Sequence, residues 1–158
     1  MIKKIIMGIS MLTILATTSF AIETTVALEL LKSDVQVVKK ELIAENIGIK
    51  DKALMEKFLV AYGEYEKAEK PLLDKNLNII KEYAKAVKTM DDATAAGLGK
   101  KLMKSRDDKT KLLRTTYKNI SKQFGEVIGV RFLQLENRIN LLINIQVSEE
   151  IPLIQPAK

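Results

Sequence analysis

The chain of 158 residues contains no cysteine, no histidine and no tryptophan. Without cysteine it can form neither a disulfide bond nor a thiolate nucleophile. Without histidine it lacks the usual base of catalytic triads and the commonest ligand of protein-bound metals. These absences exclude most familiar catalytic and metal centres, so we expect neither an enzyme nor a bound cofactor or metal.

Two weaker signals of chemistry do not change this expectation. No serine is followed by a lysine three positions later, so the Ser–Lys nucleophile pair is missing. The stretch from Gly97 to Lys100 looks like part of a phosphate-binding loop. However, Thr94 stands where such a loop has its first glycine, and Lys101 stands where it has Ser or Thr.

Acidic residues form two clusters. Glu64, Glu66 and Glu69 make up the first, and Asp107 and Asp108 the second. Both clusters alternate with lysines, which is typical of a solvated helix face stabilised by charge pairs three and four residues apart. The alternative is a divalent metal held by carboxylates alone.

The first 21 residues have the form of a secretory signal peptide. Lys3 and Lys4 precede an uncharged apolar run from Ile5 to Ala16, and Ser19 and Ala21 are small residues suited to a cleavage site. The run is too short for a convincing membrane span, and an uncleaved N-terminal anchor is the alternative. We therefore expect Sec-dependent export, cleavage near Ala21 and a periplasmic location.

Cleavage would leave a helical domain over residues 22–147 and a proline-bearing tail over residues 148–158. The formal net charge of +6 would fall to +4, because two lysines and no acidic residues are lost. So small an excess favours solubility and weak attraction to anionic surfaces, and it does not point to a nucleic-acid partner.

The clearest pattern runs from Asp51 to Val87. Apolar residues recur there every three or four positions, close to the 3.5-residue repeat that keeps one side of a long helix against a partner. They are Leu54, Phe58, Ala61, Tyr65, Ala68, Leu72, Ile79, Tyr83 and Ala86. Asp51 is expected to cap this helix, and Pro71 to kink it; two shorter helices are the alternative.

Three more helical patterns flank this one. The first runs from Thr24 to Asn46 and stops before Gly48. The next begins at Thr89 or Asp91 and has its apolar positions at Leu98, Leu102, Ser105, Leu112, Thr116, Ile120 and Phe124. The last covers Val130 to Val147 and follows a short apolar connection bracketed by Gly125 and Gly129.

Together these patterns predict an all-α fold of about four helices, built on a long bent antiparallel helical hairpin with flanking helices. The last segment is apolar on several faces and must be covered on several sides. This cover could come from the first helix or from a second copy of the chain, and we expect a homodimer.

Six cations fall on one face of the third helical segment, and we call them the basic face. They are Lys100, Lys104, Lys111, Arg114, Lys118 and Lys122. At about 100° per residue they lie opposite the apolar positions of the same helix. Such a face would attract an acidic client, lipid headgroups or lipopolysaccharide. Asp107 interrupts it, and an ordinary solvated helix face is the alternative.

The order of elements resembles that of a known family. A first helix is followed by the turn Asn46-Ile47-Gly48-Ile49-Lys50-Asp51, a long helix carrying Phe58, Tyr65 and Ile79-Ile80-Lys81, and later the segment from Arg131 to Asn137. This layout is similar to that of the Spy/CpxP-like and related metal-resistance periplasmic proteins, in which a Leu-Thr-x-x-Gln turn opens a long helix. The corresponding turn here reads Ile49-Lys50-Asp51-Lys52-Ala53.

The resemblance implies a bent helical hairpin that dimerises into a thin cradle. It also implies binding of unfolded proteins without ATP, or damping of an envelope-stress sensor. Metal-sensing relatives use histidine and other ligands that this chain does not have, so metal sensing is disfavoured.

We therefore expect a non-enzymatic periplasmic chaperone or envelope-stress adaptor. It would bind unfolded or partner envelope proteins weakly, through apolar patches between helix ends together with the basic face. Weak contact with an anionic membrane surface is a further expectation. Two alternatives stay open: a holdase of the Skp type, and an envelope structural protein that binds anionic lipid.

Overall fold

The computed structural model describes residues 38–149, 151, 153 and 154, and every regular element within them is helical. A helix over residues 38–46 is followed by α3 (Lys52–Ala86), the 3₁₀ turn η1 (Val87–Thr89), α4 (Asp92–Phe124) and α5 (Glu126–Glu149). The predicted all-α fold is confirmed. The predicted signal peptide and most of the predicted first helix lie outside the described residues.

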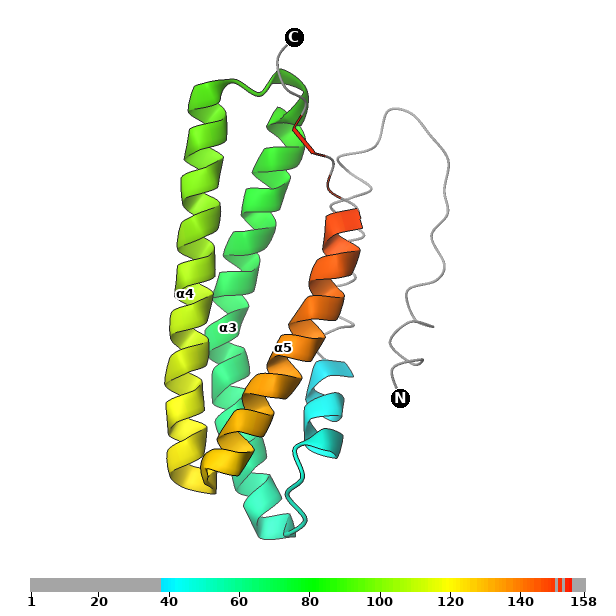
Figure 1. Cartoon of the computed structure of the whole chain (residues 1–158), viewed down its shortest axis with the longest axis vertical. Helices are drawn as coiled ribbons and strands as arrows, with labels where there is room; N and C mark the ends of the chain where they lie inside the picture. The colour runs from blue at the N-terminus through cyan, green and yellow to red at the C-terminus, as the bar shows by residue number, and fades with distance from the viewer. Residues whose placement is uncertain (1–37, 150, 152, 155–158) are drawn as a thin grey trace.

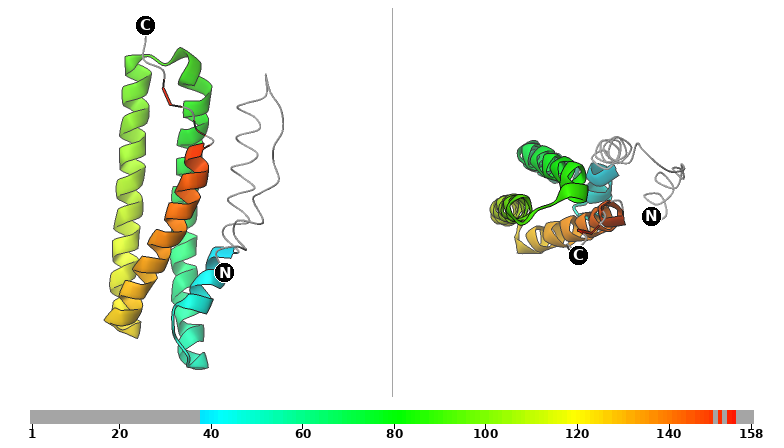
Figure 2. Two further views of the ribbon diagram at one scale, coloured as in Figure 1. Left: turned by 45° about the vertical axis from the view of Figure 1, so that its right-hand side comes forward. Right: turned by 90° about the horizontal axis from the view of Figure 1, so that it is seen from above.

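The helices form an elongated bundle. α3 and α4 are an antiparallel hairpin, and α5 turns back from the end of α4 and runs up beside the pair (Figure 1). The helix over residues 38–46 lies on the open side, next to α3 and α5, as the turned view and the view from above also show (Figure 2). No helix in the described part of the chain is both long and apolar enough to cross a membrane.

The predicted helix starts are confirmed by their caps. Asp51 accepts a hydrogen bond of 2.8 Å from the backbone N–H of Leu54, and Asp91 accepts one of 2.7 Å from that of Thr94. Each bond satisfies a backbone donor that has no partner inside its helix. Gly48 follows the helix over residues 38–46 with φ +87°, a conformation that side chains with a Cβ rarely adopt.

Pro71 does not end the helix. α3 continues through it as one element of 35 residues, so the alternative of two shorter helices is wrong. Pro71 is exposed, which leaves the carbonyl group that loses its N–H partner within reach of water. The axis of α3 bows along its length in Figure 1, in line with the predicted bend.

The predicted apolar connection between the last two helices is wrong. Val127, Ile128 and Gly129 already belong to α5, and Gly125 alone reverses the chain, with φ +89°. Gly129 serves close packing instead of a break: a Cβ added there would overlap Ser121 Oγ and lie 3.1 Å from Ser121 Cβ. Two small residues therefore let α4 and α5 approach closely beside their turn.

The core lies where residues 38–47 meet the three long helices, in the lower half of the view in Figure 1. Its fully or nearly fully buried side chains are Ile43, Ile47, Phe58, Tyr62, Tyr65, Ile120, Phe132 and Ile139. Phe132 meets Tyr65 edge-on at 5.5 Å between ring centroids, and Phe58 meets Phe124 in the same way at 5.6 Å. Such pairs add to the burial of apolar area.

The predicted apolar side of α3 is confirmed at Phe58, Tyr65 and Ile79, which are buried. It fails at Leu54 and Ala68, which are exposed, while Tyr62 is fully buried without having been predicted. At the other end of the chain, α5 runs two residues beyond the predicted limit of Val147, so residues 148 and 149 belong to the helix and not to the tail.

Candidate functional site

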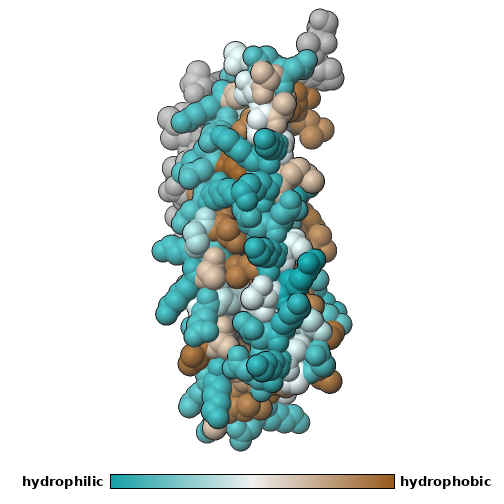
Figure 3. Space-filling model, turned by 90° about the vertical axis from the view of Figure 1, so that its left-hand side faces the viewer, coloured by the Kyte–Doolittle hydropathy of each residue, from teal (hydrophilic) through white to brown (hydrophobic). Residues whose placement is uncertain are grey.

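The six residues of the basic face all lie on α4 and are all exposed. On the same helix Ser105, Thr116 and Ile120 are buried, so the cations do lie opposite the packed side. Figure 3 views the molecule from the side along which α4 runs; hydrophilic residues cover most of this surface and hydrophobic ones form separate patches. Asp107 is exposed as well.

One member of the basic face is held by an acidic neighbour. Lys104 Nζ lies 3.1 Å from Asp108 Oδ1, while Lys75 of α3 contacts the other oxygen of the same carboxylate at 2.9 Å. The hydrogen bonds from Lys75 and Lys104 lower the pKa of Asp108. Asp108 therefore ties α3 to α4 at the edge of the basic face.

A second group of charged residues is buried where four helical segments meet. Lys39 Nζ lies 2.7 Å from Glu69 Oε2 and 2.9 Å from Glu136 Oε2, and these three side chains are 2%, 1% and 0% exposed. Lys39 comes from the helix over residues 38–46, Glu69 from α3 and Glu136 from α5. The prediction that Glu69 belongs to a solvated helix face is wrong.

Two tyrosine hydroxyls complete the surroundings of the carboxylates. Tyr65 donates to Glu136 Oε2 at 2.9 Å and lies 3.0 Å from Glu69 Oε1, and Tyr62 donates to Glu136 Oε1 at 3.1 Å. Lys39 also lies over the Tyr65 ring, 5.2 Å from its centroid. Burial, and then the negative charge of Glu136, raise the pKa of Tyr62 and Tyr65 far above the usual value.

Lys109 of α4 connects this group to the surface. Its Nζ donates to Asn140 Oδ1 at 2.8 Å and lies 3.6 Å from Glu69 Oε1, with about a third of the side chain (35%) exposed. Burial lowers the pKa of Lys109, against the opposing charge of Glu69. Burial alone would lower the pKa of Lys39 too, but the charges of Glu136 and Glu69 outweigh it and raise that pKa.

We call Lys39, Glu69, Lys109 and Glu136 the buried charge cluster. Two lysines balance two glutamates, and all four carboxylate oxygens lie near a donor or cation. In the described part of the chain no three acidic residues are grouped so that they could hold a metal ion. The arrangement is that of a charge-balanced packing device, since each member is held by its neighbours.

The spacing of the sequence contains the signal that would have found this cluster. Glu69 follows Tyr62 and Tyr65 by seven and four residues, so it faces the same side of α3 as these buried rings. Glu136 likewise follows Phe132 by four residues. The alternation of glutamate with lysine favoured a solvated face. The helix register contradicts that interpretation, because it places Glu69 and Glu136 on the buried sides of their helices.

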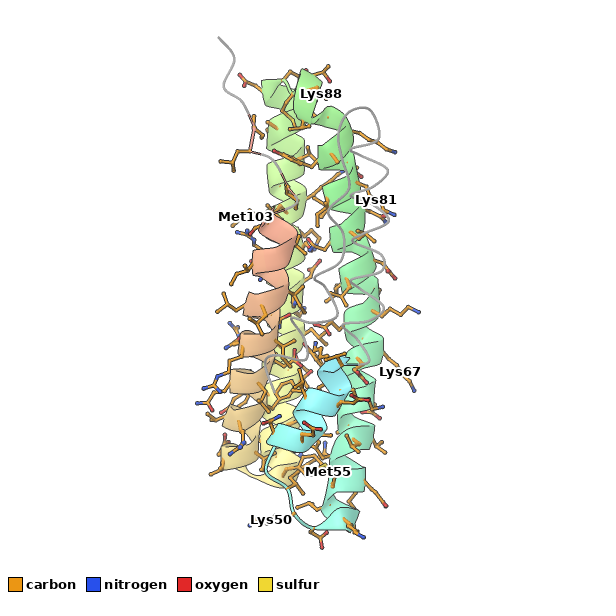
Figure 4. All side chains as sticks on the ribbon, turned by 90° about the vertical axis from the view of Figure 1, so that its right-hand side faces the viewer. Lys50, Met55, Lys67, Lys81, Lys88 and Met103 are labelled. Carbon is orange, nitrogen blue, oxygen red and sulfur yellow. The ribbon has the colours of Figure 1, made fainter. Side chains whose placement is uncertain are left out.

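The segment that carries Lys39 is fastened at its other end as well. Arg131 Nε of α5 donates to the backbone carbonyl of Asn46 at 2.6 Å, and the Arg131 guanidinium packs over Gly48, where a Cβ would lie 3.5 Å from Arg131 Cζ. Lys40, in contrast to Lys39, is 51% exposed and lies 3.9 Å from Glu66. Figure 4 shows the helix over residues 38–46 lying between α5 and α3.

Large apolar side chains are also exposed at several places. Those at least 45% exposed within the helices are Val60, Met103, Val127, Val130, Leu141 and Ile145. Leu141 and Ile145 are one turn apart on α5, and Met103 lies beside the first cations of the basic face on α4. Val127 follows the turn at the end of α4.

No protein-family model, curated protein or solved structure matches this chain. The resemblance to the Spy/CpxP-like proteins therefore stays a prediction, and function has to be argued from the surface and the buried charge cluster.

Proposed function

We propose that the chain is an exported, non-enzymatic helical protein that acts in the periplasm as a chaperone or envelope-stress adaptor. It would bind unfolded or partner proteins weakly, and work as a homodimer. The observation that carries this proposal is the exposed face of α4, on which six cations run the length of a long helix with the exposed Met103 beside them.

This combination suits an unstructured client. The cations attract acidic stretches at long range, and exposed apolar side chains offer weak contacts to apolar segments. The non-enzymatic part of the proposal rests on the missing His and Cys and on the mutual pairing within the buried charge cluster.

Aggregation of a reduced, unfolding client protein tests the proposal. The full chain at a stoichiometric ratio is expected to suppress light scattering. Replacing Lys100, Lys118 and Lys122 by Gln is expected to weaken suppression severalfold. The control replaces Lys57, Lys67 and Lys70, which are exposed on α3, and removes the same net charge.

Equal losses in the two triple variants would show a general effect of net charge and no role for the basic face. Failure of the unaltered chain to suppress aggregation at any ratio would remove the chaperone proposal.

The same basic face supports a second candidate, an envelope protein that binds anionic lipid. Flotation with vesicles containing phosphatidylglycerol tests it, and added salt is expected to abolish the binding because exposed charges are screened. Binding that is unchanged when Lys100, Lys118 and Lys122 are replaced by Glu would contradict it.

A further inference from the structure

Residues 38–49, which we call the strap, pack on the bundle through one row of buried side chains, with Leu42 and Ile49 partly buried against the same core and Arg131 bonded to the Asn46 carbonyl. Lys39, Ile43 and Ile47 are four residues apart and so lie along one side of the segment, and all three are buried: 2%, 0% and 0% exposed. The outer residues Lys40, Glu41 and Glu45 are exposed. The described part of the strap is thus an amphipathic helix and turn whose buried side joins the core of the bundle.

The surface beneath the strap is built by α3 and α5. The aromatic rings of Tyr62, Tyr65 and Phe132 pack against one another in the core that also takes Ile43 and Ile47. Beyond the rings lie the carboxylates of Glu69 and Glu136, which hold Lys39. This surface offers apolar contacts followed by two negative charges, and the strap fits it with two isoleucines and a lysine.

Several features allow the strap to leave while the rest of the bundle stays folded. Most of the stability of a helix in a protein comes from the packing of its apolar side, so the helical form of residues 38–46 depends on docking. Asp51 caps α3 from within its own first turn, so the start of α3 does not depend on the strap. The ion pairs of Lys39 add little net stability, because burying the charges offsets their attraction, and release would hydrate both carboxylates.

We infer that the strap covers a docking groove, and that a client helix displaces it. The occupant is an amphipathic helical segment of an unfolded or partner protein, with a lysine followed by large apolar residues four and eight positions later, as in the strap. Recognition of this kind lays the apolar side of a helix into a groove and uses charge at its end for selection. The inference rests on the proposed function and names the client that this groove prefers.

The test uses the full chain and a labelled synthetic peptide with the sequence of residues 38–50. In one variant Ile43→Ala and Ile47→Ala loosen the strap. The control is Ile79→Ala, which removes the same kind of buried side chain from α3 away from the strap. Binding is measured by fluorescence anisotropy, and opening of the strap by hydrogen–deuterium exchange of the amides of residues 38–46.

The loosened variant is expected to bind the peptide about tenfold more tightly than the unaltered chain, because a larger fraction of its grooves is open. A peptide with Glu in place of its first lysine is expected to lose this affinity. Bound peptide should remove the exchange protection of the strap in the unaltered chain and leave α3 protected.

Three results would overturn the inference. They are equal gains in the Ile79→Ala control, no binding to the loosened variant, and peptide binding that leaves the strap amides protected. If the loosened variant loses its helical circular dichroism signal, the test rests on the unaltered chain. Hydrogen–deuterium exchange of its strap amides with excess peptide then shows whether the peptide displaces the strap. Suppressed aggregation with a protected strap refutes only this inference, whereas strap displacement without suppression refutes only the proposed chaperone function.

Discussion

At the scale of single residues, the most unusual feature is a buried lysine, Lys39, which is 2% exposed. Lys39 is tolerated because Glu69 and Glu136 lie within 2.9 Å of its Nζ. The sequence shows each of these residues but not their meeting, because they come from three segments far apart in the chain. Glu69 and Glu136 were predictable as buried from the helix register alone, whereas Lys39 as their partner was not.

Replacing Lys39 by Met keeps the length of the side chain and removes its charge. Two buried carboxylates would then face each other, and among the described residues Lys109 is the cation that still contacts one of them, Glu69. We expect a loss of up to about 3–5 kcal/mol in the free energy of unfolding, measured by urea denaturation. Lys40→Met is the matched control, because Lys40 is 51% exposed and is expected to change stability by less than about 0.5 kcal/mol. Equal effects at the two positions would contradict the burial argument.

The raised pKa values of Tyr62, Tyr65 and Lys39 predict a loss of stability at alkaline pH. Above about pH 10 the unfolded chain releases the tyrosine protons, and above about 10.5 that of Lys39, while the folded chain keeps all three. The contribution of these three groups to the free energy of unfolding is therefore fully present below pH 10. It falls as the pH rises, by about 1.4 kcal/mol per pH unit for each group. The pKa of Lys109 is lowered in the folded chain, so its contribution has the opposite sign: stability rises with pH, and this rise is complete at about pH 10.5.

The measurement is a titration from pH 8 to 12 that follows helix content and tyrosinate absorbance together. A chain with Tyr83→Phe and Tyr117→Phe confines the absorbance to the two buried tyrosines. Both signals are expected to change in one transition. Tyrosinate that forms while the helices stay intact would count against the buried hydrogen bonds.

At the scale of elements, the ends of the helices were the most predictable feature, and the turn between α4 and α5 was the least predictable. Asp51, Asp91 and Gly48 act locally, so their residue types predict their structural roles. Gly129 was interpreted as a break because glycine weakens helices, but its role depends on Ser121 in the neighbouring helix. Packing between helices is a tertiary fact that no local pattern contains.

Two glycine substitutions separate these roles. Gly129→Ala would push a methyl group into Ser121 and is expected to lower the free energy of unfolding by about 1–3 kcal/mol. Gly97→Ala places the same methyl group where no atom lies within 4 Å, and is expected to stabilise α4 by about 0.5–1 kcal/mol. Thermal unfolding of both variants is the measurement, and stabilisation by Gly129→Ala would contradict the close contact of α4 with α5.

At the scale of the whole molecule, the bundle leaves apolar side chains on the outer side of α5. Leu141 is 60% exposed and Ile145, one turn later, is 48% exposed. The proposed homodimer gives these side chains a partner, since an exposed apolar pair on one face favours association. The sequence predicted that α5 needs cover on several sides, and among the described residues the structure supplies it from α3, α4 and the strap, while Leu141 and Ile145 stay exposed.

Light scattering after size exclusion measures the mass in solution, and a dimer is expected. Leu141→Glu with Ile145→Glu is expected to give a monomer, because two charges would face each other across the contact. Val60→Glu on α3, which is 67% exposed, is the control and should leave the mass unchanged. A monomer from the unaltered chain would remove the homodimer from the proposal.

The balance of the buried charge cluster has a consequence for the order in which the molecule closes. Until α5 is present, the cluster has two lysines and only one carboxylate, that of Glu69. The unpaired positive charge would keep this part of the interior hydrated. A chain that emerges from its N-terminus first receives Glu136 after the other three members of the cluster. The interior can therefore lose its water only after α5 has packed on the other helices, so the buried charge cluster closes last.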